Sequence, residues 1–181
     1  MKKIVAIFLF TVSLVLISCG NDKKNSEPEV IEVETTKEKE AYVSEKMEVE
    51  FNDPKVAEIY KEYIDLKTAL VNANAETAGK EASDLMTAFA NIGVDEDTFM
   101  AAQSIVESED IETQRSAFVS VTNKVESMLE GAIKSGKVYK QYCPMAFGNT
   151  GGYWLSNSKD IMNPYFGDKM LKCGRVSEEI E

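Results

Sequence analysis

The feature that most limits the possible folds is a helical period of apolar residues that begins after Asp53 and lasts to Gly136. In its first segment Asp53 is a capping residue, and Pro54 fits the first helical position. Apolar residues then recur every three or four positions and share one face: Val56, Ile59, Tyr60, Tyr63, Leu66 and Leu70. The pattern predicts a helix that buries this face.

Three more segments with the same period follow along the chain. Asn74 caps a second helix that ends at Gly93, a shorter helix covers about Glu96 to Glu107, and Asp110 caps a long helix that ends at Gly136. Connections of a few residues favour antiparallel neighbours. The predicted fold class is therefore all-α, an up-and-down bundle of three long helices and one short helix.

This bundle is expected to occupy residues 53–136, and residues 137–181 are expected to form a C-terminal cap of the same domain. The helical period stops there, and Pro144 together with Asn-Gly and Asn-Pro turn signals divides the segment. We therefore expect the cap to be rich in loops with two or three short strands. Its predicted packing anchors are aromatic: Tyr153, Trp154, Tyr165 and Phe166.

The first 18 residues have the pattern of an export signal and not of a folded element. Lys2 and Lys3 precede a run of 14 apolar residues, and the four residues from Leu16 to Cys19 have the spacing of a lipoprotein signal. The alternatives are an uncleaved signal anchor and a secretory signal without lipid. We expect residues 1–18 to be removed and Cys19 to become the lipidated N-terminus, anchored in a membrane of a Gram-negative cell envelope.

Gly20 follows the lipidated cysteine, and the absence of Asp at this position favours the outer membrane, with the protein facing the periplasm. Residues 19–52 are rich in Glu, Lys, Ser and Thr and carry few large apolar groups. Such a composition buries too little surface to offset the entropy of ordering. It predicts a disordered acidic tether between the membrane and the bundle.

Charge and composition exclude several classes of function. The full chain has a net charge of −11, and removal of residues 1–18 leaves 18 Lys+Arg against 31 Asp+Glu, a net charge of −13. A chain this acidic is repelled by phosphate backbones, so nucleic acid is not an expected partner. The sequence also has no histidine. This excludes Ser-His and Cys-His nucleophiles and the usual zinc sites, and we do not expect an enzyme.

The cap concentrates the sulfur atoms of the chain. It holds Cys143, Cys173, Met145, Met162 and Met170. Three interpretations compete: a disulfide between the two cysteines, which an oxidising compartment favours; simple packing; and a site for a soft metal ion. Thiolate and thioether sulfurs select monovalent copper or silver over hard divalent ions.

The cap also carries a motif that resembles a known family. Cys143-Pro-Met-Ala, Trp154-Leu-Ser, Asn163-Pro-Tyr and Cys173-Gly occur in order, with Gly167 and Met170 between the last two. This run, together with helices that begin YKEYIDLKTALV, is similar to the uncharacterised family called domain of unknown function 3347. The resemblance covers roughly residues 56–180.

Members of that family occur as lipoproteins and as C-terminal extensions of adaptor subunits of copper and silver efflux pumps. The resemblance therefore implies a role in heavy-metal handling, with an efflux adaptor protein as a partner. Family members often carry a histidine before the Cys-Pro-Met unit, where this chain has Tyr142. Any metal site here must therefore use sulfur alone.

Two hypotheses follow. The first is a membrane-tethered protein that binds monovalent copper or silver through Cys143, Met145, Met170 and Cys173, with Met162 as a weaker candidate. The second is a metal-free interaction module. In that case a Cys143–Cys173 disulfide staples the cap, which presents Tyr153, Trp154 and Tyr165 to a partner protein.

Overall fold

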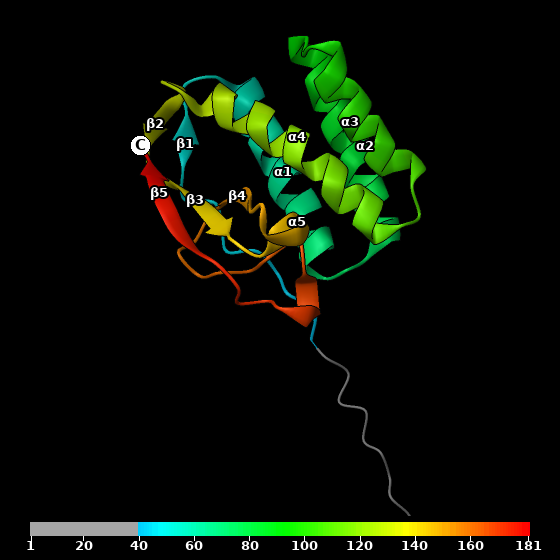
Figure 1. Ribbon diagram of the computed structural model, residues 1–181. Coiled ribbons are helices and arrows are strands. Elements are labelled where there is room, and N and C mark those ends of the chain that lie inside the picture. The colour runs from blue at the N-terminus through cyan, green and yellow to red at the C-terminus, as the bar shows by residue number, and fades with distance from the viewer. Residues whose placement is uncertain (1–39) are drawn as a thin grey trace, which may run out of the picture. The chain divides into compact units, whose positions relative to one another are not determined.

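The computed structural model describes residues 40–181, so the predicted export signal, Cys19 and the first part of the predicted tether lie outside the described residues. Figure 1 shows a helical bundle beside a small sheet. The elements in chain order are β1 (Glu50–Phe51), α1 (Pro54–Val71), α2 (Ala75–Ile92), α3 (Glu96–Glu107), α4 (Ile111–Leu129), β2 (Ile133–Ser135), β3 (Val138–Cys143), α5 (Ala146–Asn149), β4 (Gly152–Ser156), the 3₁₀ turn η1 (Gly167–Lys169) and β5 (Arg175–Ile180). None of the helices within residues 40–181 combines the length and apolarity that a membrane span requires.

Polar capping residues begin the long helices as the sequence predicts. The side chains of Asp53, Asn74 and Asp110 each accept a hydrogen bond from a backbone N–H in the first turn of α1, α2 and α4. Asp95 does the same for α3. Gly93 ends α2 in the left-handed conformation, with φ of 77°. The predicted helix starts are therefore confirmed.

The number and length of the helices differ from the prediction in two ways. The helix predicted to be short, α3, has 12 residues and buries Ala102 and Ile105, so the bundle has four long helices, and the short α5 lies in the cap. The last long helix stops at Leu129 and not near Gly136, because Gly131 adopts a φ of 67° and breaks the helix. Ile133 then pairs with Phe51 in a two-stranded sheet.

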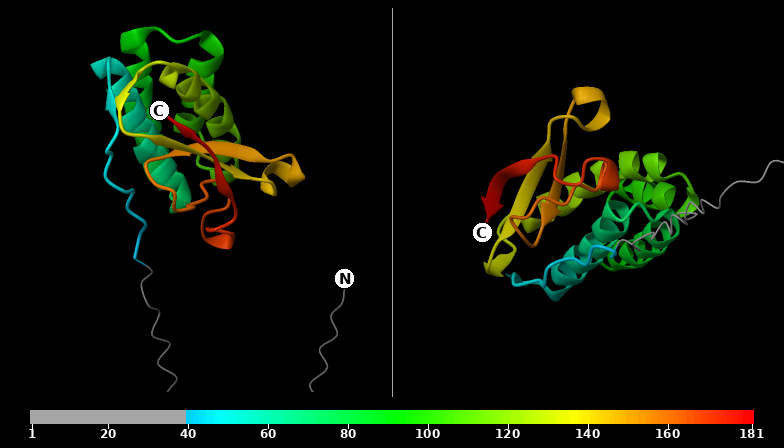
Figure 2. Two further views of the ribbon diagram at one scale, coloured as in Figure 1. Left: turned by 90° about the vertical axis from the view of Figure 1, so that its left-hand side faces the viewer. Right: turned by 90° about the horizontal axis from the view of Figure 1, so that it is seen from below.

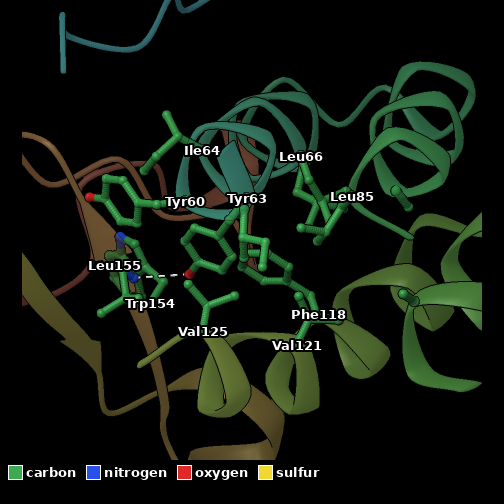
Figure 3. Packing of buried hydrophobic residues seen from close by; sticks show 14 of the residues in the cluster. Tyr60, Tyr63, Ile64, Leu66, Leu85, Phe118, Val121, Val125, Trp154 and Leu155 are labelled. Atoms are coloured by element: carbon green, nitrogen blue, oxygen red, sulfur yellow. Dashed lines mark hydrogen bonds between the residues drawn. The ribbon is translucent and has the colours of Figure 1, made fainter. Parts of the chain in front are cut away.

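The core of the domain joins the bundle to the sheet through aromatic side chains. The ring of Tyr63 in α1 stacks on Phe118 of α4 with 5.0 Å between centroids. Its hydroxyl accepts a hydrogen bond of 3.0 Å from the backbone N–H of Leu155 in β4 (Figure 3). Trp154 and Leu155 are fully buried. The bundle and the cap therefore share one core.

The cap contains a three-stranded antiparallel sheet in the order β4-β3-β5. The β3–β4 hairpin pairs Cys143 with Gly152, and β5 pairs along the other edge of β3. In Figure 2 this hairpin projects away from the helices at its turn. The prediction of short strands in a loop-rich cap is confirmed.

Residues 40–52, predicted as the end of a disordered tether, are instead packed on the domain. Residues 42–49, which we call the strap, run along α1 toward β1, and Val49 is buried. Tyr42 exchanges two backbone hydrogen bonds with the side-chain amide of Asn72, of 2.8 and 2.9 Å. Apolar residues at a few positions and these specific partners order the segment, although its overall composition is that of a linker.

Candidate functional site

The two cysteines of the cap lie in contact. Cys143 ends β3 and is fully buried, while Cys173 precedes β5 and is half-buried. Their Sγ atoms are 3.0 Å apart, and both thiols are free. A disulfide bond is about 2.05 Å long, so the predicted disulfide is not formed in this structure. The fold nevertheless brings together two cysteines that are 30 residues apart in the chain. Both hypotheses need this contact.

Gly174 allows Cys173 to approach Cys143. Its φ of 148° is a conformation that other residues rarely adopt. A Cβ atom here would lie 2.9 Å from the Trp154 ring and 3.0 Å from the carbonyl oxygen of Tyr142. The chain next to Cys173 can therefore pass this close to β3 only with glycine at position 174.

Asn163 fixes the loop that carries Cys173. This side chain is fully buried, and its Nδ2 donates a hydrogen bond of 2.7 Å to the carbonyl oxygen of Cys173. Its Oδ1 accepts a bond of 2.8 Å from the backbone N–H of Tyr165, and its own N–H donates to Leu171. The sequence marked Asn163-Pro164 only as a turn, and nothing in the local pattern indicated that its amide would reach ten residues along the chain.

Two further buried polar side chains hold the cap, and sequence reasoning missed both. Gln141 of β3 donates to the carbonyl oxygens of Ser158 and Asp160 at 2.8 and 3.1 Å. Arg115 of α4 donates to the carbonyl oxygen of Pro164 at 2.8 Å and to that of Leu70 in α1 at 3.2 Å. Arg115 therefore ties the cap to two helices of the bundle. The sequence did not indicate this role, because Arg115 lies within a helix, where a charged residue is expected to face the solvent.

The surroundings of Cys173 favour the protonated form of its thiol. The hydrogen bond with Cys143 raises the pKa of Cys173 above its ordinary value, and burial adds to this effect. Tyr165 lies nearby, and burial holds the pKa of its hydroxyl well above the usual range. Binding of a metal ion to the two sulfurs would therefore have to release protons.

The predicted methionine ligands occupy different positions. Met145 lies two residues beyond Cys143 and is 48 % exposed. Met170 is half-buried, and its carbonyl oxygen accepts a 3.0 Å hydrogen bond from the N–H of Cys173, so it shares the turn that carries this thiol. Met162 lines a hollow of about 350 Å³ together with Tyr42. Met145 and Met170 therefore adjoin the thiols in the chain, and Met162 faces another part of the surface.

The aromatic residues predicted to meet a partner are mostly internal. Trp154 is fully buried and Tyr165 is 4 % exposed, so both serve the packing role also predicted for them and neither can reach a partner protein. Tyr153 is 40 % exposed and packs beside Tyr142, with 4.5 Å between ring centroids. Of the three predicted contact residues, only Tyr153 is accessible. Phe166 is partly buried against the core.

Hard ligands gather elsewhere, on the surface of α1 and α2. Within residues 40–181, the carboxylates of Glu62, Glu81 and Asp84 lie within 4.8 Å of one another. Lys61 and Lys80 already form ion pairs with them. The cluster is therefore part of a network of surface ion pairs on α1 and α2.

Lys67 is a buried amine beneath the strap. It is almost fully buried in α1, and its Nζ donates one hydrogen bond, of 3.3 Å, to the hydroxyl of Ser156. The Tyr42 ring lies 5.8 Å from the amine. Burial lowers the pKa of Lys67 to about 8, against an opposing influence of Glu45. This charge is poorly compensated, and it is covered by a segment that the sequence suggested would be free.

One comparison with known proteins gives a match. Residues 59–136, from within α1 to the end of β2, match the family model described as "Protein of unknown function (DUF3347)". No curated protein and no solved structure matches the chain significantly. The match ends before Cys143, so the C-terminal motif lies outside it. The resemblance to the DUF3347 family that the sequence predicts is thereby confirmed over residues 59–136.

Proposed function

We propose that this protein binds a soft monovalent metal ion, copper or silver, through the reduced thiols of Cys143 and Cys173. The observation that carries the proposal is the 3.0 Å separation of their sulfur atoms. Thiolates select soft ions. The sequence has no histidine that would widen the choice of metal.

The dimensions of the pair suit a single ion after a small movement. With metal–sulfur bonds of about 2.3 Å, as for thiolate ligands of zinc, two thiolates on one ion can be at most about 4.6 Å apart. The sulfurs must therefore separate from 3.0 Å. Cys173 is the thiol that can turn, because it is half-buried while Cys143 is enclosed.

Thioether ligands would complete the site. Met170 is the first candidate, because a hydrogen bond places its backbone in one turn with Cys173. Met145 is the second, because it is exposed and follows Cys143 by two residues. Met162 is expected to contribute little, since it lines a separate hollow.

The test is an anaerobic titration of the reduced protein with monovalent copper against a chromophoric chelator. We expect the chain to withdraw copper from the chelator, Cys143→Ser and Cys173→Ser to abolish this, and Met170→Leu to weaken it about tenfold, equivalent to about 1.4 kcal/mol. Met100→Leu is the matched control, because Met100 is an exposed methionine on α3. Copper binding that survives both serine substitutions would overturn the proposal.

The expected setting of this activity is the cell envelope. Lipidation of Cys19 would anchor the protein to the outer membrane, and the acidic residues that precede the strap would let the domain move near the surface. The proposed role is heavy-metal handling or efflux, with transfer of the ion to or from an efflux adaptor protein. Labelling with a radioactive fatty acid, lost in Cys19→Ser, tests the anchor separately.

The alternative function is a metal-free interaction module whose cap is stapled by a Cys143–Cys173 disulfide. Contact between the two sulfurs favours this as well, because little movement would bring them to bonding distance. Tyr153 is the accessible aromatic residue for a partner. A thiol count on denatured protein from the envelope separates the two: two free thiols contradict the staple, and none contradicts copper binding in that state.

A further inference from the structure

Charge is distributed unevenly between the two parts of the domain. Residues 53–136 carry 7 Lys+Arg against 16 Asp+Glu, a net charge of −9. The cap, residues 137–181, carries 6 Lys+Arg against 5 Asp+Glu, a net charge of +1. The negative charge of the domain is therefore concentrated in the bundle, and the cap is close to neutral.

A groove runs along the outer face of α2 and α3 in the acidic part. Two hollows, of about 720 and 550 Å³, share Ser83 and Val106 and so form one depression. A third hollow shares Gln103 and Glu107 with the second and extends the depression to Met100. Met100 and Val106 are 53 % and 38 % exposed. The groove combines apolar side chains with acidic ones: Met86, Phe99, Met100, Val106, Glu76, Glu107 and Glu109.

The acidic side chains of this groove are not neutralised by the domain itself. Within residues 40–181, neither Glu76, Glu107 nor Glu109 forms an ion pair. Lys80 lines the same groove, but its amine is paired with Glu81 and Asp84. The groove therefore offers negative charge around an apolar floor.

The turn of the β3–β4 hairpin has the opposite character. Residues 144–152, which we call the hairpin tip, contain no charged residue and project from the domain (Figure 2). Met145 and Phe147 of the tip are 48 % and 38 % exposed, and Tyr153 beside it is 40 % exposed. Phe147 has a φ of 52°, and its ring lies edge-on to that of Tyr165 with 4.9 Å between the ring centroids. A strained aromatic residue is thus fixed in a half-exposed position.

Basic residues lie around the tip. Lys172 adjoins Cys173, and Arg175 stacks on Tyr142 with 4.9 Å between the guanidinium and the ring. No carboxylate of residues 40–181 forms an ion pair with either of them. The tip is therefore apolar with unpaired positive charge beside it, and the groove is apolar with unpaired negative charge.

We propose that the hairpin tip of one copy of this chain docks into the α2–α3 groove of a second copy. The two surfaces match in both respects that the structure shows, because each exposes apolar side chains and their rims carry opposite charges. Five of the seven large apolar side chains exposed within residues 40–181 belong to the tip, its flank or the groove. The contact is head-to-tail, so each copy keeps a free tip or groove and chains can grow.

This inference does not depend on metal binding, but it affects the thiol pair. The tip begins directly after Cys143, so docking would cover the approach to both sulfurs. A lipid anchor would raise the local concentration of copies and favour a contact that is weak in solution. The proposed partner is a second copy of the chain. If the tip instead binds a different acidic protein, the purified chain will not self-associate in the test below.

The test is sedimentation equilibrium of the purified reduced protein without metal, from about 10 µM to about 1 mM, a range that covers weak contacts. We expect the average mass to rise with concentration and the rise to weaken in high salt. Arg175→Glu reverses the charge beside the tip and Met100→Glu changes the groove, and each alone should abolish the rise. Asn123→Glu, on an exposed position of α4, is the matched control and should behave as the original chain.

Mixing the two variants gives the decisive result. The Met100→Glu chain keeps a tip and the Arg175→Glu chain keeps a groove, so an equal mixture should form a dimer and nothing larger. A tip-to-tip contact would instead be unaffected by Met100→Glu. A monomeric mass up to about 1 mM, or a mixture that stays monomeric while both variants retain their far-ultraviolet circular dichroism and copper titration, overturns the proposal.

Discussion

The helical bundle and the cap are stabilised in different ways. The bundle buries apolar stripes that recur along four helices, and its helix starts are set by polar caps. The cap depends on a few buried polar side chains, Gln141, Asn163 and the intruding Arg115, and on Gly174. Apolar contacts therefore dominate in the bundle, where Gln114 is a buried polar side chain that donates to three carbonyl oxygens, whereas single residues decide the geometry around the thiols.

The largest loss of stability is expected when the residue that joins the bundle to the cap is replaced. Arg115→Met should destabilise the domain by about 3 kcal/mol, because it leaves the buried carbonyl oxygen of Pro164 without its side-chain donor and removes one of the donors to the carbonyl oxygen of Leu70. Urea denaturation followed by circular dichroism and by Trp154 fluorescence measures it. Lys124→Met, which removes a partly exposed ion pair with Asp95, is the control and should cost much less. Equal losses in the two variants would contradict the special role of Arg115.

Removal of a buried polar group that lacks good partners should increase the stability of the domain instead of lowering it. Lys67→Met should stabilise the domain by about 2 kcal/mol at pH 7, because it removes an amine with one long hydrogen bond from the interior. The folded pKa of about 8 lies below the ordinary value of 10.5. Between these two values the unfolded chain binds more protons, so the original chain should gain stability as the pH rises from 8 to 10.5.

Below pH 8 both states of Lys67 hold the proton and the full cost is present, so the advantage of Lys67→Met should be largest there and shrink toward pH 10.5. Thermal melts of both proteins across this range give the difference directly. An advantage that does not depend on pH would show that the pKa of Lys67 in the folded state is not lowered from its ordinary value.

A smaller effect on stability, with a specific effect on the thiols, is expected at Gly174. Gly174→Ala should cost between about 1 and 2 kcal/mol, because the added methyl group meets Trp154 and the Tyr142 carbonyl oxygen. The two sulfurs should also move apart, so oxidation by diamide should form the Cys143–Cys173 disulfide more slowly. Gly93→Ala is the control, because Gly93 has a positive φ and open space around it. This variant should lose stability through backbone strain, and its thiols should react at the original rate.

The smallest effect is expected for a helix cap in the bundle. Asn74→Ala should cost about 1 kcal/mol, because the N–H of Thr77 at the start of α2 loses its acceptor. Chemical denaturation measures the loss, and the rate of disulfide formation should be unchanged. A change in thiol reactivity here would show that the bundle and the cap are more closely coupled than their different construction implies.

The same contrast explains what the sequence could predict. Periodicity and capping patterns located α1 and α2 because their determinants are local, and Cys143 and Cys173 stood out by type. The contacts of Asn163 and Arg115 join residues 10 and 49 positions apart, and no local pattern encodes them. The end of α4 was misplaced because Gly131 was not recognised as a helix break, and the pairing of β2 with β1, in a segment read as a tether, could not be seen from local patterns.

The route by which the chain enters the domain has a mechanical consequence. The strap meets the body first at the Tyr42–Asn72 pair, then at the hydrogen bond from Asn157 to the Glu45 carbonyl oxygen, and last at β1. A pull transmitted through the residues before Tyr42 would load these contacts one after another, as in peeling, and not all at once. The strap would come away from Lys67 while the four helices are still folded, so tension on the chain would expose an amine before it threatened the core.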